Sequence, residues 1–217
     1  MGGLFRIDGK LMRYCTKLGY LLWLQVLTIL CSLPIFTAGA AFCAMHKVLL
    51  QIYRDTENRI TKTFFASFLE NFRQATMLWL MYIVYFALLI LDYLLATKSA
   101  SPALRASLYF LPILAIAGYL SLIWIFPLQS RYNNTLLQTV KLSFTLVFFR
   151  PLTAIVLAAL TMIPVALLML TLYSFPYLVF LGITGPGFIQ TLLHSRIFDY
   201  LEGTDWRKQQ AEELIEQ

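Results

Sequence analysis

Two histidines, His46 and His194, are the side chains of this chain best suited to moving a proton or holding a ligand. Each stands seven positions after a glycine, Gly39 in one case and Gly187 in the other. Imidazole titrates near neutral pH, so a pair of this kind can relay protons or bind a ligand inside a membrane protein. Each histidine also stands where a polar residue at a membrane interface is expected. The sequence leaves both interpretations open.

A second candidate is the run Gly185, Pro186 and Gly187, which interrupts an apolar segment. A glycine-proline break inside a membrane-spanning helix frees backbone groups that only protein or trapped water can satisfy, and such breaks often line cavities. The alternative is a plain kink or the end of a short helix.

Arg73 and Arg150 form a third candidate pair, because each lies in the pattern Phe-Arg-x-x-Thr that leads into an apolar segment. The match suggests an internal repeat of the kind that transporters contain. The simpler interpretation is that each arginine anchors the start of a helix at the lipid headgroups.

Recognisable catalytic chemistry is missing. The sequence contains no G-x-S-x-G, H-E-x-x-H, P-loop or dinucleotide-binding fingerprint. Its three cysteines show no C-x-x-C spacing, and two histidines with few acids do not suggest a metal site. We therefore expect no catalytic residues, no metal, no cofactor and no enzymatic activity.

Composition indicates a membrane protein. Of 217 residues, 59% are hydrophobic and 13% charged, and the mean hydropathy is +0.72. Soluble domains carry about 25% charged residues. The net charge of +6 comes from basic residues that flank apolar blocks rather than from one patch. This arrangement fits membrane topology and anionic lipids, and no nucleic-acid partner is expected.

The predicted fold class is an all-α bundle of about five transmembrane helices. A helix needs about 20 apolar residues to cross the hydrocarbon layer, and five segments qualify. Their ranges are 18–36, 75–96, 106–128, 151–173 and 175–193. The distribution of lysine and arginine predicts the N-terminus outside and the C-terminus in the cytoplasm, although the basic residues before the first segment favour the reverse.

Three further segments have the polar stripe of an amphipathic helix: 39–54, 61–73 and 131–150. Each is predicted to lie in the headgroup region or beneath the spans on the cytoplasmic side, either as an anchor or as a docking surface. Residues 1–202 thus form one helical domain, and 203–217 form a polar tail.

The sequence also resembles the YesL family of bacterial membrane proteins, a family of unknown function, over nearly the whole chain. The resemblance rests on short runs of residues: Gly3-Leu4-Phe5, Leu11-Met12-Arg13, Leu30-Cys31-Ser32-Leu33-Pro34 with Thr37 and Gly39, Arg54-Asp55, Phe65 to Ala75, and Arg131-Tyr132-Asn133-Asn134-Thr135. Tyr132 stands where Phe is expected, and the second half matches more loosely.

The resemblance implies a location in the bacterial cytoplasmic membrane and genes that often lie beside carbohydrate importers and two-component sensors. It brings no catalytic residues. We therefore expect a non-catalytic accessory component of a carbohydrate uptake or sensing system, in the lipid bilayer and in contact with an ABC-type permease or a sensor kinase. The broken last span and the internal echoes suggest a stand-alone transporter of small solutes instead. A membrane signal receiver is a third alternative. The sequence does not indicate the oligomeric state.

Overall fold

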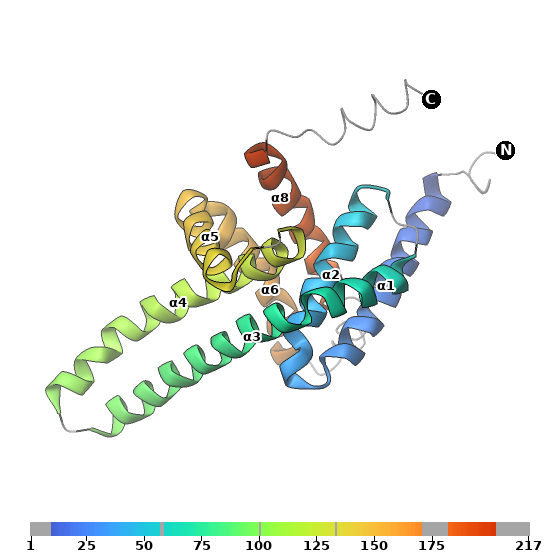
Figure 1. Ribbon diagram of the computed structural model, residues 1–217. Coiled ribbons are helices and arrows are strands. Elements are labelled where there is room, and N and C mark those ends of the chain that lie inside the picture. The colour runs from blue at the N-terminus through green and yellow to red at the C-terminus, as the bar shows by residue number, and fades with distance from the viewer. Residues whose placement is uncertain (1–9, 57–58, 100, 133, 171–181, 203–217) are drawn as a thin grey trace.

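A computed structural model describes residues 10–56, 59–99, 101–132, 134–170 and 182–202. This part of the chain contains helices and no strand, which confirms the predicted all-α bundle (Figure 1). The α-helices are α1 (Lys10–Ser32), α2 (Ala38–Tyr53), α3 (Ile60–Lys98), α4 (Pro102–Arg131), α5 (Leu136–Phe149), α6 (Pro151–Leu170) and α8 (Thr184–Glu202). A 3₁₀ turn, Ile35–Thr37, joins α1 to α2.

Helix α2 lies in the middle of the molecule, packed against α1, α3, α4 and α8. The segment 39–54 is predicted to lie in the headgroup region or packed beneath the spans, and in the structure most of its side chains are buried in the bundle. Small residues in its first turns let neighbouring helices approach. At Gly39, for example, an added Cβ would lie 2.5 Å from the carbonyl oxygen of Ala75. A polar stripe therefore does not place this helix at the surface, because its polar side chains find protein partners.

Helix α3 is one unbroken helix of 39 residues that joins the predicted segments 61–73 and 75–96. At 1.5 Å per residue it is about 58 Å long, nearly twice the roughly 30 Å of the hydrocarbon layer. Residue 74, the expected boundary, is Gln74, which neither caps nor breaks a helix. The polar first half and the apolar second half thus form a single rod.

Helices α5 and α6 meet at a bend of 106°. Proline disfavours the helical conformation in the residue before it and lacks the N–H that a continuing helix needs. Arg150, just before Pro151, accordingly leaves the helical region, with φ −134° and ψ 58°. Thr135 and Gln138 form a capping box at the start of α5. Both ends of α5 are thus encoded locally.

In the described part of the chain, four helices are long and apolar enough to cross a membrane, or five if the bent α5–α6 pair counts as one span. The four are α1, α2, α3 and α4, so α2 is a candidate span that the sequence analysis did not include. The predicted span 175–193 is not among these candidates. Residues 175–181 lie outside the described part of the chain, and α8, which begins at Thr184, is not among the four. The polar tail 203–217 also lies outside the described residues.

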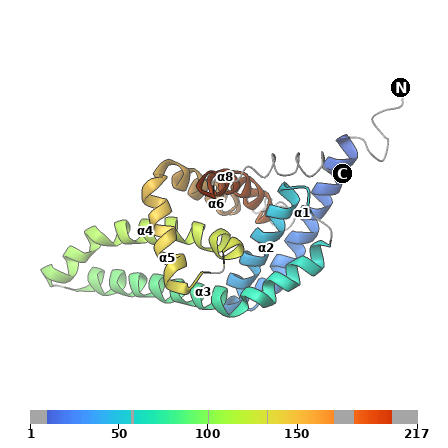
Figure 2. The same ribbon diagram turned by 45° about the horizontal axis from the view of Figure 1, so that its top comes forward.

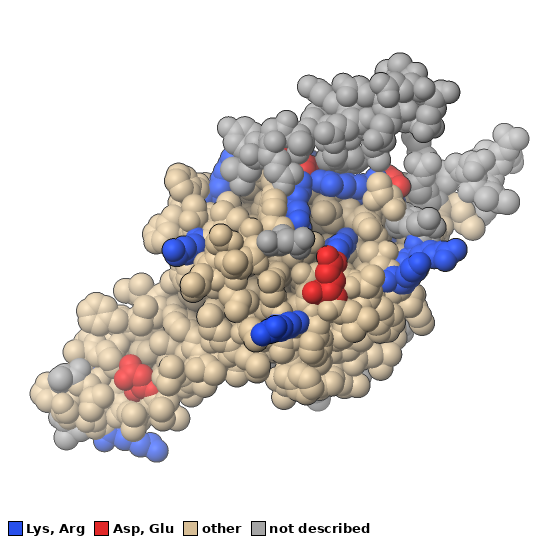
Figure 3. All heavy atoms as spheres, in the orientation of Figure 1, with Lys and Arg blue, Asp and Glu red and all other residues tan. Residues whose placement is uncertain are grey.

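The second half of α3 and the first half of α4 project from the bundle as a two-helix arm (Figures 1 and 2). Within the arm the helices approach closely at Gly118, which faces the ring of Tyr85. The hydroxyl of Tyr85 donates a hydrogen bond to the carbonyl of Leu114 at 2.8 Å. On the face shown in Figure 3, charged side chains gather over the bundle and near the far end of the arm, with an uncharged stretch between them.

Candidate functional site

The start of α8 is fixed by a side chain from α1. The side-chain oxygen of Gln25 accepts hydrogen bonds from the backbone N–H groups of Ile183 (3.2 Å) and Thr184 (2.8 Å). The hydroxyl of Thr184 donates to the carbonyl of Leu21 at 3.2 Å. Gln25 and Thr184 are fully buried. The first N–H groups of a helix have no partner within that helix, so Gln25 allows α8 to begin inside the bundle.

Gly185, Pro186 and Gly187 form the first turn of α8. Proline is tolerated there because its missing N–H has no role in a first turn. Gly187 lets α8 pack closely on α2, where an added Cβ would lie 3.1 Å from Cδ1 of Leu49. The predicted break is therefore a helix start packed against α2.

Beside this turn lies a cavity of about 340 Å³. Its walls come from α2, α3, α4, α6 and the start of α8, and both Pro186 and Gly187 line it. Most of the lining is aliphatic or aromatic, including Trp79 and Phe126. Its hydrogen-bonding side chains other than the Trp79 indole belong to His46, Thr161 and Gln190, and none of the described lining residues is charged. The indole N–H of Trp79 is already bonded to the carbonyl of Ile35.

The structure brings His46 of α2 and His194 of α8 together, with 6.3 Å between the ring centroids. His46 is 8% exposed and His194 2% exposed. The ring of His194 also lies 4.6 Å from that of Trp124 and stacks on Phe198 at 6.0 Å. Sequence reasoning singled out both histidines, and their contact comes from the packing of α8 on α2.

His194 is buried. Neither ring nitrogen has a partner among the residues that the structure describes. A second, water-sized cavity of about 20 Å³ lies against it, lined also by His46, Ser130, Arg131 and Ser195. Helix α8 is not among the candidate spans. Burial, and then the neighbouring His46, lower the pKa of His194 well below its ordinary value of 6.5.

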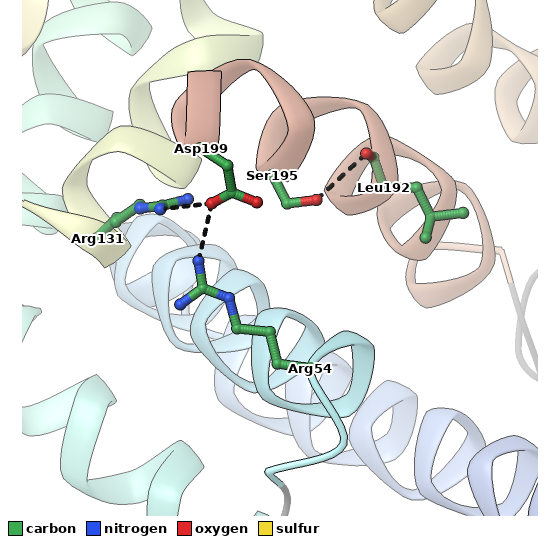
Figure 4. Close-up of polar contacts among 5 residues, drawn as sticks. All are labelled: Arg54, Arg131, Leu192, Ser195 and Asp199. Atoms are coloured by element: carbon green, nitrogen blue, oxygen red, sulfur yellow. Dashed lines mark hydrogen bonds and ion pairs between the residues drawn. The ribbon is translucent and has the colours of Figure 1, made fainter. Parts of the chain in front are cut away.

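Next to the small cavity, Asp199 holds two arginines (Figure 4). Its Oδ1 accepts a hydrogen bond from Nη2 of Arg54 at 3.0 Å and from Nη2 of Arg131 at 2.9 Å. The Arg131 guanidinium also lies 5.2 Å from the ring centroid of Phe198. Asp199 is 15% exposed in its side chain. The cluster ties α2, α4 and α8 together at the end of the histidine site.

Sequence reasoning assigned no role to this cluster or to Gln25. Arg54 and Arg131 do stand in the runs that carry the family resemblance, which is a signal that the two positions matter. Asp199 and Gln25 carried no such signal. Their partners lie 145 and 159 positions away along the chain, so only the fold reveals them.

Arg73 and Arg150 lie on the surface, away from both cavities. Arg73 stands within unbroken α3, whereas Arg150 stands at the bend between α5 and α6. The same five-residue pattern therefore adopts two different backbone conformations. The structure groups the two histidines with Pro186 and Gly187 and leaves these two arginines outside.

Comparisons with known proteins bear on the family. The family described as a protein of unknown function, DUF624, matches residues 18–93, which span α1, α2 and most of α3. Over 196 residues the chain is 26% identical to the uncharacterized protein YesL of Bacillus subtilis (strain 168), covering 88% of this chain and 91% of that protein. No solved structure matches the chain. The chain is thus similar to the DUF624 family over residues 18–93 and to YesL over most of its length.

Proposed function

We propose that this protein is a non-catalytic membrane protein that binds a small, uncharged and largely apolar molecule in the 340 Å³ cavity. The cavity carries the proposal. Ligand sites measure about 300–1,000 Å³, are mostly apolar and contain a few placed polar groups. The cavity has this size and this kind of lining.

The lining indicates the class of ligand. Burying a charge without a partner is costly, and the described lining offers no opposite charge. His46, Thr161 and Gln190 offer hydrogen bonds to one or two polar groups. A sugar, with hydroxyls on every side, would leave most of them facing aromatic and aliphatic walls. A link to carbohydrate uptake, which the resemblance implies, would then depend on a partner protein rather than on this cavity.

The start of α8 supports the idea that the bound molecule is transported. In transporters, substrate sites lie where helices begin or break inside the bundle. Here α8 begins beside the cavity, and Gln25 of α1 satisfies its first N–H groups. The stand-alone transporter of small solutes is therefore the alternative that the geometry favours.

The direct test is quenching of Trp79 fluorescence by 8-bromo-1-octanol, an uncharged alcohol, on purified protein in nanodiscs. Trp79 lines the cavity, so we expect saturable quenching that is lost in Trp79→Phe. Ile123→Phe, which places a larger side chain in the cavity, should weaken the saturable quenching. Ile113→Phe is the matched control, because Ile113 lies on the same helix but is exposed on the arm. Quenching that never saturates, or that is equal in Ile123→Phe, would reflect partition into lipid and overturn the proposal.

The projecting arm favours a second candidate function, an accessory subunit. Tyr109 is 82% exposed there, and Phe110 and Leu88 are also exposed. Such a surface suits contact with another membrane protein as well as with lipid. The partner would be an ABC-type permease or a sensor kinase, as the resemblance implies.

A pull-down of tagged protein from native membranes in mild detergent, read by mass spectrometry, tests this accessory function. Recovery of such a subunit in near-equal amount, lost in Tyr109→Lys but kept in Lys62→Glu on the first half of α3, would support it. Recovery of this chain alone would contradict it.

A further inference from the structure

We propose that the small cavity between His46 and His194 holds one water molecule through which the two imidazoles exchange a proton, so that binding in the large cavity is linked to protonation. This inference rests on the proposed function, because it assigns a coupling role to a wall of the same ligand site.

The two cavities share a wall, and the wall is His46. Its side chain lines the large cavity on one side and the water-sized cavity on the other. His194 lines the small cavity but not the large one. A ligand that hydrogen-bonds to His46 therefore contacts a ring whose centroid lies 6.3 Å from that of His194.

The size and polarity of the small cavity fit one water molecule. Its volume of about 20 Å³ exceeds the roughly 10–15 Å³ that a water requires. The hydroxyls of Ser130, Thr191 and Ser195 line it, and each already donates its hydrogen to a carbonyl of its own helix at 2.8–3.2 Å, as in the 2.9 Å bond from Thr191 to Gly187. Each hydroxyl therefore has lone pairs left to accept from a water. The water in turn can accept from an imidazole N–H.

The ring nitrogens of His194 give independent evidence that a water molecule occupies the small cavity. His194 is 2% exposed, and neither ring nitrogen has a hydrogen-bond partner in the described part of the chain. Buried polar groups in proteins are almost always hydrogen-bonded to protein or to ordered water. A water in the adjoining cavity satisfies this requirement and connects the two rings.

The charged groups around the site limit it to one proton. Among the described residues, the charged side chain that lines the small cavity is Arg131, from α4. It pairs with Asp199 of α8, which also pairs with Arg54, the residue that follows α2. A second proton on the histidines would add a like charge beside the first and beside Arg131. The pair thus alternates between neutral and singly protonated.

The exchange step conserves every atom. One imidazolium gives its N–H proton to the water, and the water gives one of its own protons to the unprotonated nitrogen of the other ring. The water ends as it began. An alcohol in the large cavity that donates its hydroxyl hydrogen to His46 requires an unprotonated nitrogen there, so binding displaces the proton to solvent. By linkage, binding then weakens as the pH falls.

Nuclear magnetic resonance of ring-¹⁵N-histidine tests this directly, because the chain has two histidines. The protein carries a histidine-free tag, and spectra are recorded across pH with and without 1-octanol. We expect the two rings to titrate as a coupled pair and 1-octanol to shift both titrations together. In His46→Gln, which keeps a hydrogen-bonding side chain, bromo-octanol should still quench Trp79 while the His194 signal no longer responds to 1-octanol.

Two outcomes overturn the inference and are distinguishable. Saturable quenching of Trp79 with the same affinity at every pH, and with unmoved histidine signals, would refute the coupling and leave the proposed ligand site standing. Absence of saturable quenching in the wild-type protein would refute the ligand site and the coupling with it.

Discussion

At the residue scale, the site is a set of buried polar groups whose partners come from distant parts of the chain. Residue type alone indicated His46 and His194, because histidine is rare here and both follow a glycine at the same step. Residue type could not indicate Gln25, since one glutamine in an apolar segment carries no local sign of the backbone that it meets 159 positions later. The same holds for Asp199.

Asp199→Asn should destabilise the protein by about 1.5–3 kcal/mol, because it weakens the charge-assisted hydrogen bonds from Arg54 and Arg131 in a mostly buried cluster. Arg54 and Arg131 would then face each other without the carboxylate that both contact. Thermal unfolding in detergent measures the effect.

The control for that change is Glu70→Gln in the Lys47–Glu70 pair, where Glu70 is 53% exposed. Exposed pairs contribute at most about 1 kcal/mol. Equal losses in the two variants would show that the Asp199 cluster is no more buried than the surface pair.

Acid should destabilise the protein through His194. Its folded-state pKa lies below the ordinary 6.5, so the unfolded chain binds the proton more readily. The stabilisation is complete above pH 6.5 and is lost as the pH falls below that value. Unfolding temperatures at pH 7.5 and pH 5.5 measure it, and His194→Gln should show a smaller difference. An equal acid loss in His194→Gln would assign the effect to other groups.

At the element scale, local sequence determines where helices end, whereas packing determines what covers them. The proline at 151 and the capping box at Thr135 are readable in the sequence, and they bound α5 as observed. The burial of α2 is not readable. Its stripe of Lys47, Gln51 and Arg54 resembles a surface helix until Glu70 and Asp199 provide partners for two of the three.

Gly39→Ala tests the packing of α2 on α3. The new Cβ would lie 2.5 Å from the backbone oxygen of Ala75, so one helix must move, and overpacking of this kind costs about 1–3 kcal/mol. Gly19→Ala is the matched control, because nothing lies within 4 Å of its Cβ position. There alanine should stabilise the helix by about 0.5–1 kcal/mol. We expect the unfolding temperature to fall in Gly39→Ala and to rise in Gly19→Ala. An unchanged unfolding temperature in Gly39→Ala would contradict the close approach of the two helices.

At the scale of the whole molecule, the bundle gathers five helices around one cavity and extends an apolar arm away from it. The low charge and the lengths of the apolar segments were enough to predict an all-α bundle with helices apolar enough to cross a membrane. The cavity could not be predicted, since it depends on α6 and the start of α8 reaching α2 and α4. The orientation, N-terminus outside and C-terminus in the cytoplasm, stays a prediction from the distribution of basic residues.

Native mass spectrometry of protein taken gently from its own membranes tests the central claim most directly. We expect the wild-type protein and Ile113→Phe to retain one small, uncharged, largely apolar compound per chain, and Ile123→Phe to retain clearly less of it. A retained sugar or charged compound, or the same compound in equal amount on Ile123→Phe, would contradict the claim that this cavity is the ligand site.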